Sequence, residues 1–181
     1  LYHVSTTPEI LHNASLVHDD ISDVDEERSK EPTVRKKWYD YLEGKVPEEL
    51  RWHVADSMSI DSGDRLMNLA YLPILRSRFS DKQKTEAIQE LSRTIMDITR
   101  GQDLDMSYAR RIDDIISGRI TEEEIYFMYE LKTGRLFEFC TLLGLIFSNG
   151  SDEQRHHGSL WARRYFNLGF QIQDDFIENN I

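Results

Sequence analysis

Two clusters of acidic side chains have the spacing that a cation site needs. In residues 15–28, Asp19 and Asp23 stand four positions apart, and Asp20 lies beside Asp19. On a helix, side chains four apart share one face, and like charges there repel each other. The apolar stretch before them should face a core, so these carboxylates need a neutralising partner. A hard divalent cation with oxygen ligands would serve, and the segment therefore predicts a metal site.

The second cluster lies near the end of the chain. Gln171, Asp174, Asp175 and Glu178 fall at spacings of three and four, so a helix would again place them on one face. Each cluster has the form Asp-Asp-x-x-acid, and a pair of such clusters is more specific than either alone. The alternative is that both are solvated acidic faces, because charge runs on helices are commonly exposed.

The elements that carry these clusters are predicted to be helices. Thr7 before Pro8 is typical of a helix cap followed by a proline at the first helical position. The alternation that marks strands is missing from the sequence. We therefore predict an all-α, single-domain bundle of about seven or eight helices with no sheet. Two further helix starts are predicted from capping boxes, at Ser80 with Gln83 and at Thr121 with Glu124. Two loops are predicted, at residues 43–49 and at residues 149–158.

Charge and composition narrow the classes of function. The formal net charge of -11 argues against a general nucleic-acid partner and against docking on anionic membranes. A phosphate ligand stays possible if metal ions supply the positive charge. The single cysteine, Cys140, excludes an intrachain disulfide and is compatible with a reducing compartment, so we expect a cytoplasmic location. Apolar runs such as residues 141–147 fall short of the roughly 20 residues of a membrane span.

Residues 12–23, followed by Arg28 and residues 31–33, resemble the first aspartate-rich region of trans-prenyltransferases. These are the farnesyl, geranylgeranyl and longer polyprenyl diphosphate synthases. The resemblance extends in order over almost the whole chain. Four later segments resemble the family's Gly-Asp helix, its Gly-Gln-x-x-Asp motif, its Lys-Thr motif and its second aspartate-rich region, at residues 62–66, 101–105, 132–134 and 170–175.

This resemblance implies an isoprenoid synthase fold, in which a helical bundle surrounds a deep central cavity. It implies a prenyltransferase that condenses isopentenyl diphosphate with an allylic diphosphate in a head-to-tail step. It also implies about three Mg²⁺ ions once diphosphate is bound, bridging it to both carboxylate sets. A homodimer is implied as well.

The resemblance carries roles onto individual residues. It implies catalytic roles for Asp19, Asp23, Lys132 and Asp174. It implies substrate binding by His12, Arg28, Lys132, Thr133 and Gln171. The implied metal ligands are Asp19, Asp20, Asp23, Asp174, Asp175 and Glu178. Taken singly, Lys132 could equally be a surface lysine, Thr133 a helix residue that bonds its own backbone, and His12 a buried histidine.

The chain also departs from the family pattern. Ser29-Lys30 stands where the family has Arg-Gly, and Arg35 stands where a histidine is common. Ser29 cannot replace a bidentate guanidinium; our hypothesis is that Lys30 compensates. The family's Gly-Lys-x-x-Arg segment before the first motif and its basic segment after the second are not in this sequence. We therefore expect a chain truncated at both ends, and the alternative is a degenerate family member. Family enzymes that stop early carry bulky aromatic residues four or five positions before the first motif. Ala14 and Ser15 occupy these positions and are small, so the resemblance implies geranylgeranyl diphosphate or a longer product.

Three other functions fit parts of the pattern. A terpene cyclase shares the fold and the metal logic, and a non-catalytic regulatory subunit could keep the fold without activity. A di-iron carboxylate bundle uses Glu-x-x-His strings, which occur at Glu9 with His12 and at Glu153 with His156. The second string lies in the predicted loop at residues 149–158, which argues against a core iron site.

Overall fold

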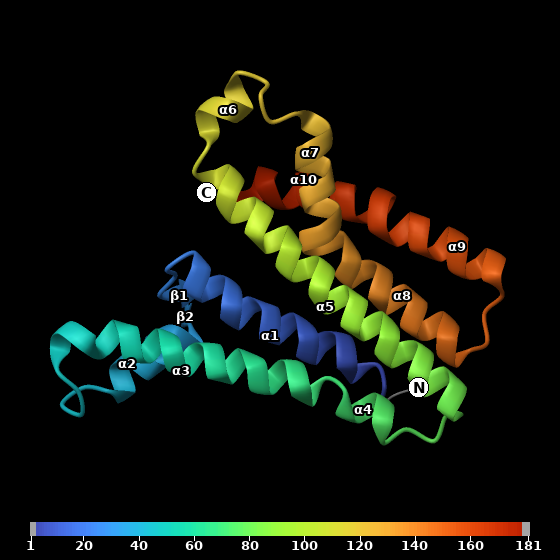
Figure 1. The fold of residues 1–181 in the computed structure, drawn as a ribbon, viewed down its shortest axis with the longest axis horizontal. Helices are drawn as coiled ribbons and strands as arrows, with labels where there is room; N and C mark the ends of the chain where they lie inside the picture. The colour runs from blue at the N-terminus through green and yellow to red at the C-terminus, as the bar shows by residue number, and fades with distance from the viewer. Residues whose placement is uncertain (1–2, 179–181) are drawn as a thin grey trace. The chain divides into compact units, whose positions relative to one another are not determined.

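The computed structural model describes residues 3–178, apart from the side chains of residue 172 and residues 174–178. Its elements are almost all helical, which confirms the predicted all-α class (Figure 1). The chain divides into two compact units, Thr6–Arg76 and residues 77–181 with the first five residues. Each unit is described by itself.

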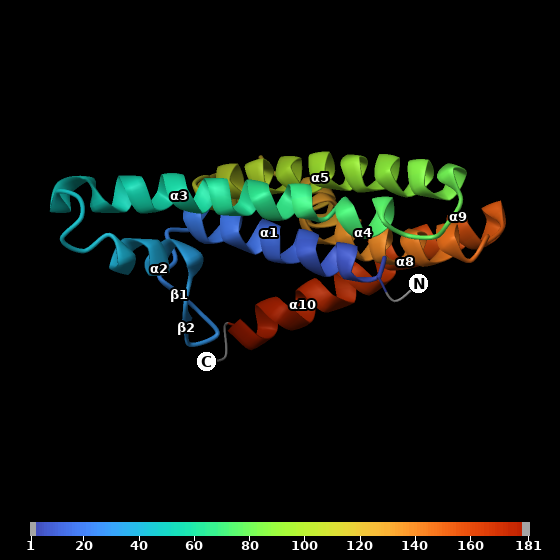
Figure 2. The ribbon, with the colours of Figure 1, turned by 90° about the horizontal axis from the view of Figure 1, so that it is seen from below.

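The Thr6–Arg76 unit is built on two long helices that pack side by side (Figure 2). Leu11 and Ala14 on the first helix and Ala55 on the second are fully buried. Gly63 allows close approach, because a Cβ there would lie 2.2 Å from Nε2 of His18. The elements of this unit are α1 (Thr6–Ser22), β1 (Glu27–Arg28), β2 (Glu31–Pro32), α2 (Val34–Tyr41), α3 (Glu48–Leu69) and α4 (Leu72–Leu75).

Stacked rings and cations attach α2 to α3. The ring of Tyr39 stacks on Trp52 with centroids 4.0 Å apart. Arg51 covers Tyr39 at 3.8 Å, and Arg35 covers Trp52 at 4.1 Å. Nε of Arg35 donates to Oδ1 of Asp56 at 2.6 Å, and Arg35 is buried. Arg35, which stands where the family commonly has a histidine, therefore has a packing role here.

The second unit is built around one long helix, α5 (Asp81–Ala109), against which the next four elements, through residue 147, pack. Leu91 on α5 and Phe139 on α8 are fully buried in it. Two turns of π-helix interrupt the later helices, and each forms where one α-helix passes into the next. The elements are α5 (Asp81–Ala109), α6 (Ile112–Ile116), α7 (Glu122–Tyr129), η1 (Glu130–Gly134), α8 (Arg135–Phe147), α9 (Asp152–Leu160), η2 (Trp161–Phe166) and α10 (Asn167–Glu178).

Local signals placed some boundaries correctly. Ser80 and Thr121 are N-caps whose capping boxes both form, as predicted, and the loop near residues 43–49 lies between α2 and α3. The predicted cap at Thr7 is wrong by a residue or two, because α1 already begins at Thr6.

Other predictions about the elements are wrong. The described residues hold ten α-helices, more than the seven or eight expected, and a hairpin of two-residue strands where no sheet was expected. The predicted loop at residues 149–158 is helical from Asp152, because Ser151 and Gln154 form a third capping box.

Candidate active site

The first aspartate cluster lies at the end of α1. Asp19 and Asp20 are in its last turn, and the backbone N–H of Asp23 donates to the carbonyl of Asp19 at 2.9 Å. The turn therefore continues helically up to Asp23, which keeps the predicted spacing of Asp19 and Asp23. Asp20 is buried and Asp23 is exposed.

Arg28 bridges the two neighbouring carboxylates of this cluster. Its Nε donates to Oδ1 of Asp20 at 2.8 Å, and its terminal nitrogen donates to Oδ2 of Asp19 at 2.9 Å. Burial raises the pKa of the Asp20 carboxyl above its usual value, and Arg28 opposes this shift. Burial alone would lower the pKa of Arg28, but Asp20 and Asp19 outweigh it and raise the pKa. A cation thus already stands between these two aspartates.

The hairpin that presents Arg28 turns through an unusual backbone conformation. Ser29 and Lys30 have φ values of 53° and 67°, and two successive positive φ values are the pattern of a type I′ turn. Glycine tolerates this region far better than lysine does. The positive φ therefore explains why the family has a glycine at the position that Lys30 occupies in this chain.

The two histidines of α1 differ in environment. His12, predicted to lie near isopentenyl diphosphate, is exposed, which excludes the buried-histidine alternative. His18 was not predicted as a site residue. Its Nε2 lies 3.4 Å from Oδ1 of Asp64, in the family's Gly-Asp segment. The signal for this pair was Gly63, which leaves room for the ring on α3.

The predicted substrate-binding residues of the second unit come together around η1. Nζ of Lys132 forms an ion pair with Asp105 of the Gly-Gln-x-x-Asp motif. The hydroxyl of Thr133 donates to Oε1 of Gln171 at 3.4 Å. Lys132 is therefore partly buried in an ion pair, and Thr133 contacts another helix. Asp105 is the last residue of the motif at residues 101–105, but it was not among the predicted site residues.

Two glycines let other backbones approach η1 closely. A Cβ on Gly101 of α5 would lie 2.3 Å from the backbone nitrogen of Lys132. A Cβ on Gly134 would lie 2.8 Å from the carbonyl oxygen of Arg163. Real Cβ contacts are longer than this, so the turn that carries Lys132 can pack in this way only with glycine at both positions.

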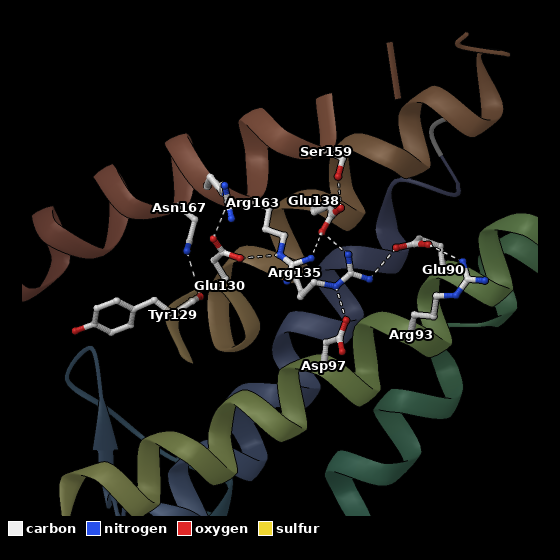
Figure 3. A network of polar contacts seen from close by, with 11 residues as sticks. Glu90, Arg93, Asp97, Tyr129, Glu130, Arg135, Glu138, Ser159, Arg163 and Asn167 are labelled. Atoms are coloured by element: carbon white, nitrogen blue, oxygen red, sulfur yellow. Dashed lines mark hydrogen bonds and ion pairs between the residues drawn. The ribbon is translucent and has the colours of Figure 1, made fainter. Parts of the chain in front are cut away.

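A network of charged and polar side chains surrounds the same turn (Figure 3). Arg135 forms ion pairs with Glu90 at 2.9 Å and with Asp97 at 2.7 Å, and it also pairs with Glu138. At the other end of η1, Glu130 pairs with Arg163 at 3.3 Å. Sequence reasoning missed this network, because its members are far apart in the chain.

The predicted metal ligands are described only in part. The backbones of Asp174, Asp175 and Glu178 lie in α10, but their side chains are outside the described residues. Within the described residues no group of three metal-ligating side chains forms. The carboxylates of Asp19 and Asp20 are hard oxygen donors, the ligand type that Mg²⁺ prefers, and Arg28 contacts one oxygen of each.

The fold does not support the di-iron alternative. Glu153 and His156 now lie on the helix α9, but both are exposed, as are Glu9 and His12 on α1. A buried iron site would need these groups to point inward.

Among the described helices, none combines the length and apolarity that a bilayer crossing requires.

Known proteins match the chain over nearly all of its length. The family model described as polyprenyl synthetase matches residues 1–180. The short chain isoprenyl diphosphate synthase of Methanothermobacter thermautotrophicus is 32% identical over 175 residues, which are 97% of this chain and 46% of that protein. The geranylgeranyl diphosphate synthase of Saccharolobus solfataricus is 32% identical over 180 residues, covering 97% of this chain and 47% of the relative. The chain spans about half the length of these curated relatives.

Solved structures agree with the fold. The crystal structure of geranylgeranyl pyrophosphate synthetase from Pyrococcus horikoshii aligns with a TM-score of 0.75 at 29% identity, covering 96% of this chain and 46% of that one. The structure of geranyltransferase from Helicobacter pylori aligns with a TM-score of 0.80 at 23% identity, covering 99% and 56%. At the lower identity the likeness concerns the fold alone, and together they confirm the predicted fold class.

Proposed function

The chain belongs to the polyprenyl synthetase family, and on that premise we propose that it is a Mg²⁺-dependent prenyltransferase that condenses isopentenyl diphosphate with an allylic diphosphate. The observation that supports this most is the meeting of three family motifs around η1. Lys132 pairs with Asp105, 27 positions away, and Thr133 bonds Gln171, 38 positions away. A helix surface without a ligand has little reason to gather these groups.

The side chains offer the donors that a diphosphate accepts. Lys132 and Arg28 carry charged N–H groups, which make the stronger hydrogen bonds to phosphate oxygens. Thr133 and Gln171 add neutral donors beside Lys132. We assign these four residues to the allylic diphosphate and His12, exposed on α1, to isopentenyl diphosphate.

The two aspartate clusters would hold Mg²⁺, about three ions in all, which when bound neutralise the diphosphate and stabilise it as a leaving group. The metal-holding residues in this proposal are Asp19, Asp20, Asp23, Asp174, Asp175 and Glu178.

The proposed step conserves atoms and charge. The C–O bond between the allylic carbon and its diphosphate breaks, and the electron pair leaves with pyrophosphate. The double bond of isopentenyl diphosphate then forms a new C–C bond with the allylic carbocation. A proton is lost, and the released pyrophosphate accepts it. The residues around Lys132 assist by stabilising the negative charge that develops on the leaving group.

The product proposed is geranylgeranyl diphosphate or longer. Ala14 is buried and Ser15 is partly buried on α1, one turn before Asp19, and both side chains are small. Small residues there leave room for a growing chain. The homodimer remains a prediction of the family resemblance, and the cytoplasmic location remains the expectation drawn from the single cysteine.

The test is elongation of labelled isopentenyl diphosphate with an allylic primer by the full chain, with Mg²⁺ and then with EDTA. We expect metal-dependent products, sized by chromatography, that disappear in Asp19→Ala and Asp174→Ala. A folded protein that elongates no primer would reject the proposal. Consumption of the primer without isopentenyl diphosphate would indicate a cyclase.

A further inference from the structure

The turn that carries Lys132 is followed directly by a buried arginine. Arg135 is the first residue of α8 and is only 6% exposed. Its guanidinium contacts three carboxylates, those of Glu90 and Asp97 on α5 and that of Glu138 one turn further along α8. Glu138 is itself buried and accepts the hydroxyl of Ser159. The position of Arg135 is therefore set from several sides.

Burial alone would lower the pKa of Arg135, but its acidic partners, with Glu138 the strongest, raise it. The buried guanidinium is thus held charged by these partners, whose contacts with it are drawn in Figure 3. Since these three carboxylates engage it and little of its surface is exposed, Arg135 has no direct part in binding a substrate.

One face of α5 contacts both the Lys132 and the Arg135 segments. Asp97, Gly101 and Asp105 are spaced four apart along α5, so they lie one above the other on the same face. Asp97 pairs with Arg135, Gly101 touches the backbone of Lys132, and Asp105 pairs with Nζ of Lys132. The three contacts follow one another along a single line.

This arrangement ties the place of Lys132 to that of Arg135. The two residues are three apart across the end of η1, and both are attached to the same line on α5. If the Arg135–Asp97 contact were lost, η1 could slide or rotate along α5, and the reach of Nζ of Lys132 would change with it.

We propose that Arg135, through Asp97, is a positioning residue that sets where the ammonium group of Lys132 stands. The inference rests on the proposed function, in which Lys132 binds a diphosphate. It concerns geometry and not folding alone, so it can be separated experimentally from a purely structural role.

The experiment is a double-mutant cycle on the binding of inorganic pyrophosphate in the presence of Mg²⁺, measured by titration calorimetry on the full chain. The single variants are Arg135→Met, Asp97→Asn and Lys132→Ala, and each of the first two is also combined with Lys132→Ala. Asp97→Asn keeps the test available if Arg135→Met does not fold, because the Asp97 side chain is 34% exposed. The matched control is Arg93→Gln, which removes an exposed guanidinium that also pairs with Glu90.

We expect Arg135→Met and Asp97→Asn each to weaken pyrophosphate binding by about tenfold, as misplacement of a binding group does. In the Lys132→Ala background the same changes should matter by less than about twofold, because there is no ammonium group left to misplace. Arg93→Gln should bind as the parent does.

An equal loss in both backgrounds would show a structural role only and overturn the proposal. Unchanged binding in Asp97→Asn would also overturn it, as would a Lys132→Ala protein that binds pyrophosphate like the parent. Elongation by the unmodified protein is measured alongside. If elongation fails while the mutant cycle shows coupling, the positioning role of Arg135 is supported and the proposed reaction is rejected.

Discussion

The two units each present a basic side chain beside carboxylates of a family motif, but they hold it by different means. Arg28 is carried by a hairpin of two-residue strands and remains 37% exposed. Lys132 is carried by a π-helical turn between close-packed backbones, next to the buried Arg135. The first cation depends on local backbone conformation, and the second depends on packing between segments distant in sequence.

This difference predicts how each region responds to change. A short hairpin can adjust at small cost, so Arg28 is suited to exchanging its partners. The turn around Lys132 is braced by buried charges and backbone contacts, whose loss is expensive. Substitutions should therefore be severe around η1 and mild around the hairpin.

The largest effect is expected from Arg135→Met. Removing this arginine takes from the buried Glu138 its main ion-pair partner and leaves, among the described residues, only Arg163 at 4.0 Å, and breaking a buried pair costs about 3–5 kcal/mol. Urea unfolding of the variant should show a loss in the free energy of unfolding of that size. Arg93→Met, at an exposed arginine, should cost only about 0–1 kcal/mol. Equal losses in the two variants would show that burial of the charge is not what matters.

Gly101→Ala should come next. Alanine usually stabilises a helix relative to glycine by about 1 kcal/mol, but here its Cβ would meet the backbone of Lys132 at 2.3 Å. We expect a loss of about 1–3 kcal/mol in thermal or urea unfolding.

Gly144→Ala is the matched control on α8, where a Cβ would meet nothing within 4 Å. It should stabilise the protein by about 0.5–1 kcal/mol. Opposite signs for the two glycines support a close contact at η1, whereas stabilisation by both would disprove it.

A smaller effect is expected from Arg28→Gln. The guanidinium occupies oxygen atoms of Asp19 and Asp20 that a divalent cation would need. Without it, Mn²⁺ alone should bind about fivefold more tightly, since partly exposed ion pairs are worth about 1 kcal/mol or less. The electron paramagnetic resonance signal of free Mn²⁺ measures this directly. Arg76→Gln changes an exposed arginine by the same charge and should leave the Mn²⁺ affinity unchanged. An equal gain in affinity in that variant would show that the effect comes from net charge alone.

The smallest effect is expected from Lys30→Gly. Lysine at a φ of 67° is strained, and glycine removes that strain at some cost in entropy of the unfolded chain. Thermal unfolding should show a gain of about 0.5–1 kcal/mol. Lys37→Gly, within the helix α2, should instead lose about 1 kcal/mol. A loss at Lys30 would mean that its side chain contributes more than its backbone conformation costs.

By itself, the sequence determined the helical class and several boundaries. Capping at Ser80 and Thr121 is a contact between neighbours in the chain, so its signal is local and could be read directly. The same signal was present at Ser151 and was overlooked in a polar segment that was predicted to be a loop. The motifs also placed Lys132, Thr133 and Gln171 together as candidates before any contact was known.

Only the tertiary structure decided what surrounds those candidates. Arg135 with Glu90, and Gly101 with Lys132, are pairs separated by 45 and 31 positions, and no local pattern links their members. Asp97, Gly101 and Asp105 form a visible i, i+4 series in the sequence, but nothing in it says which segment lies against that face. A hydrophobic or charged stripe records that a helix face is covered, and the covering partner is chosen only when the distant segments pack.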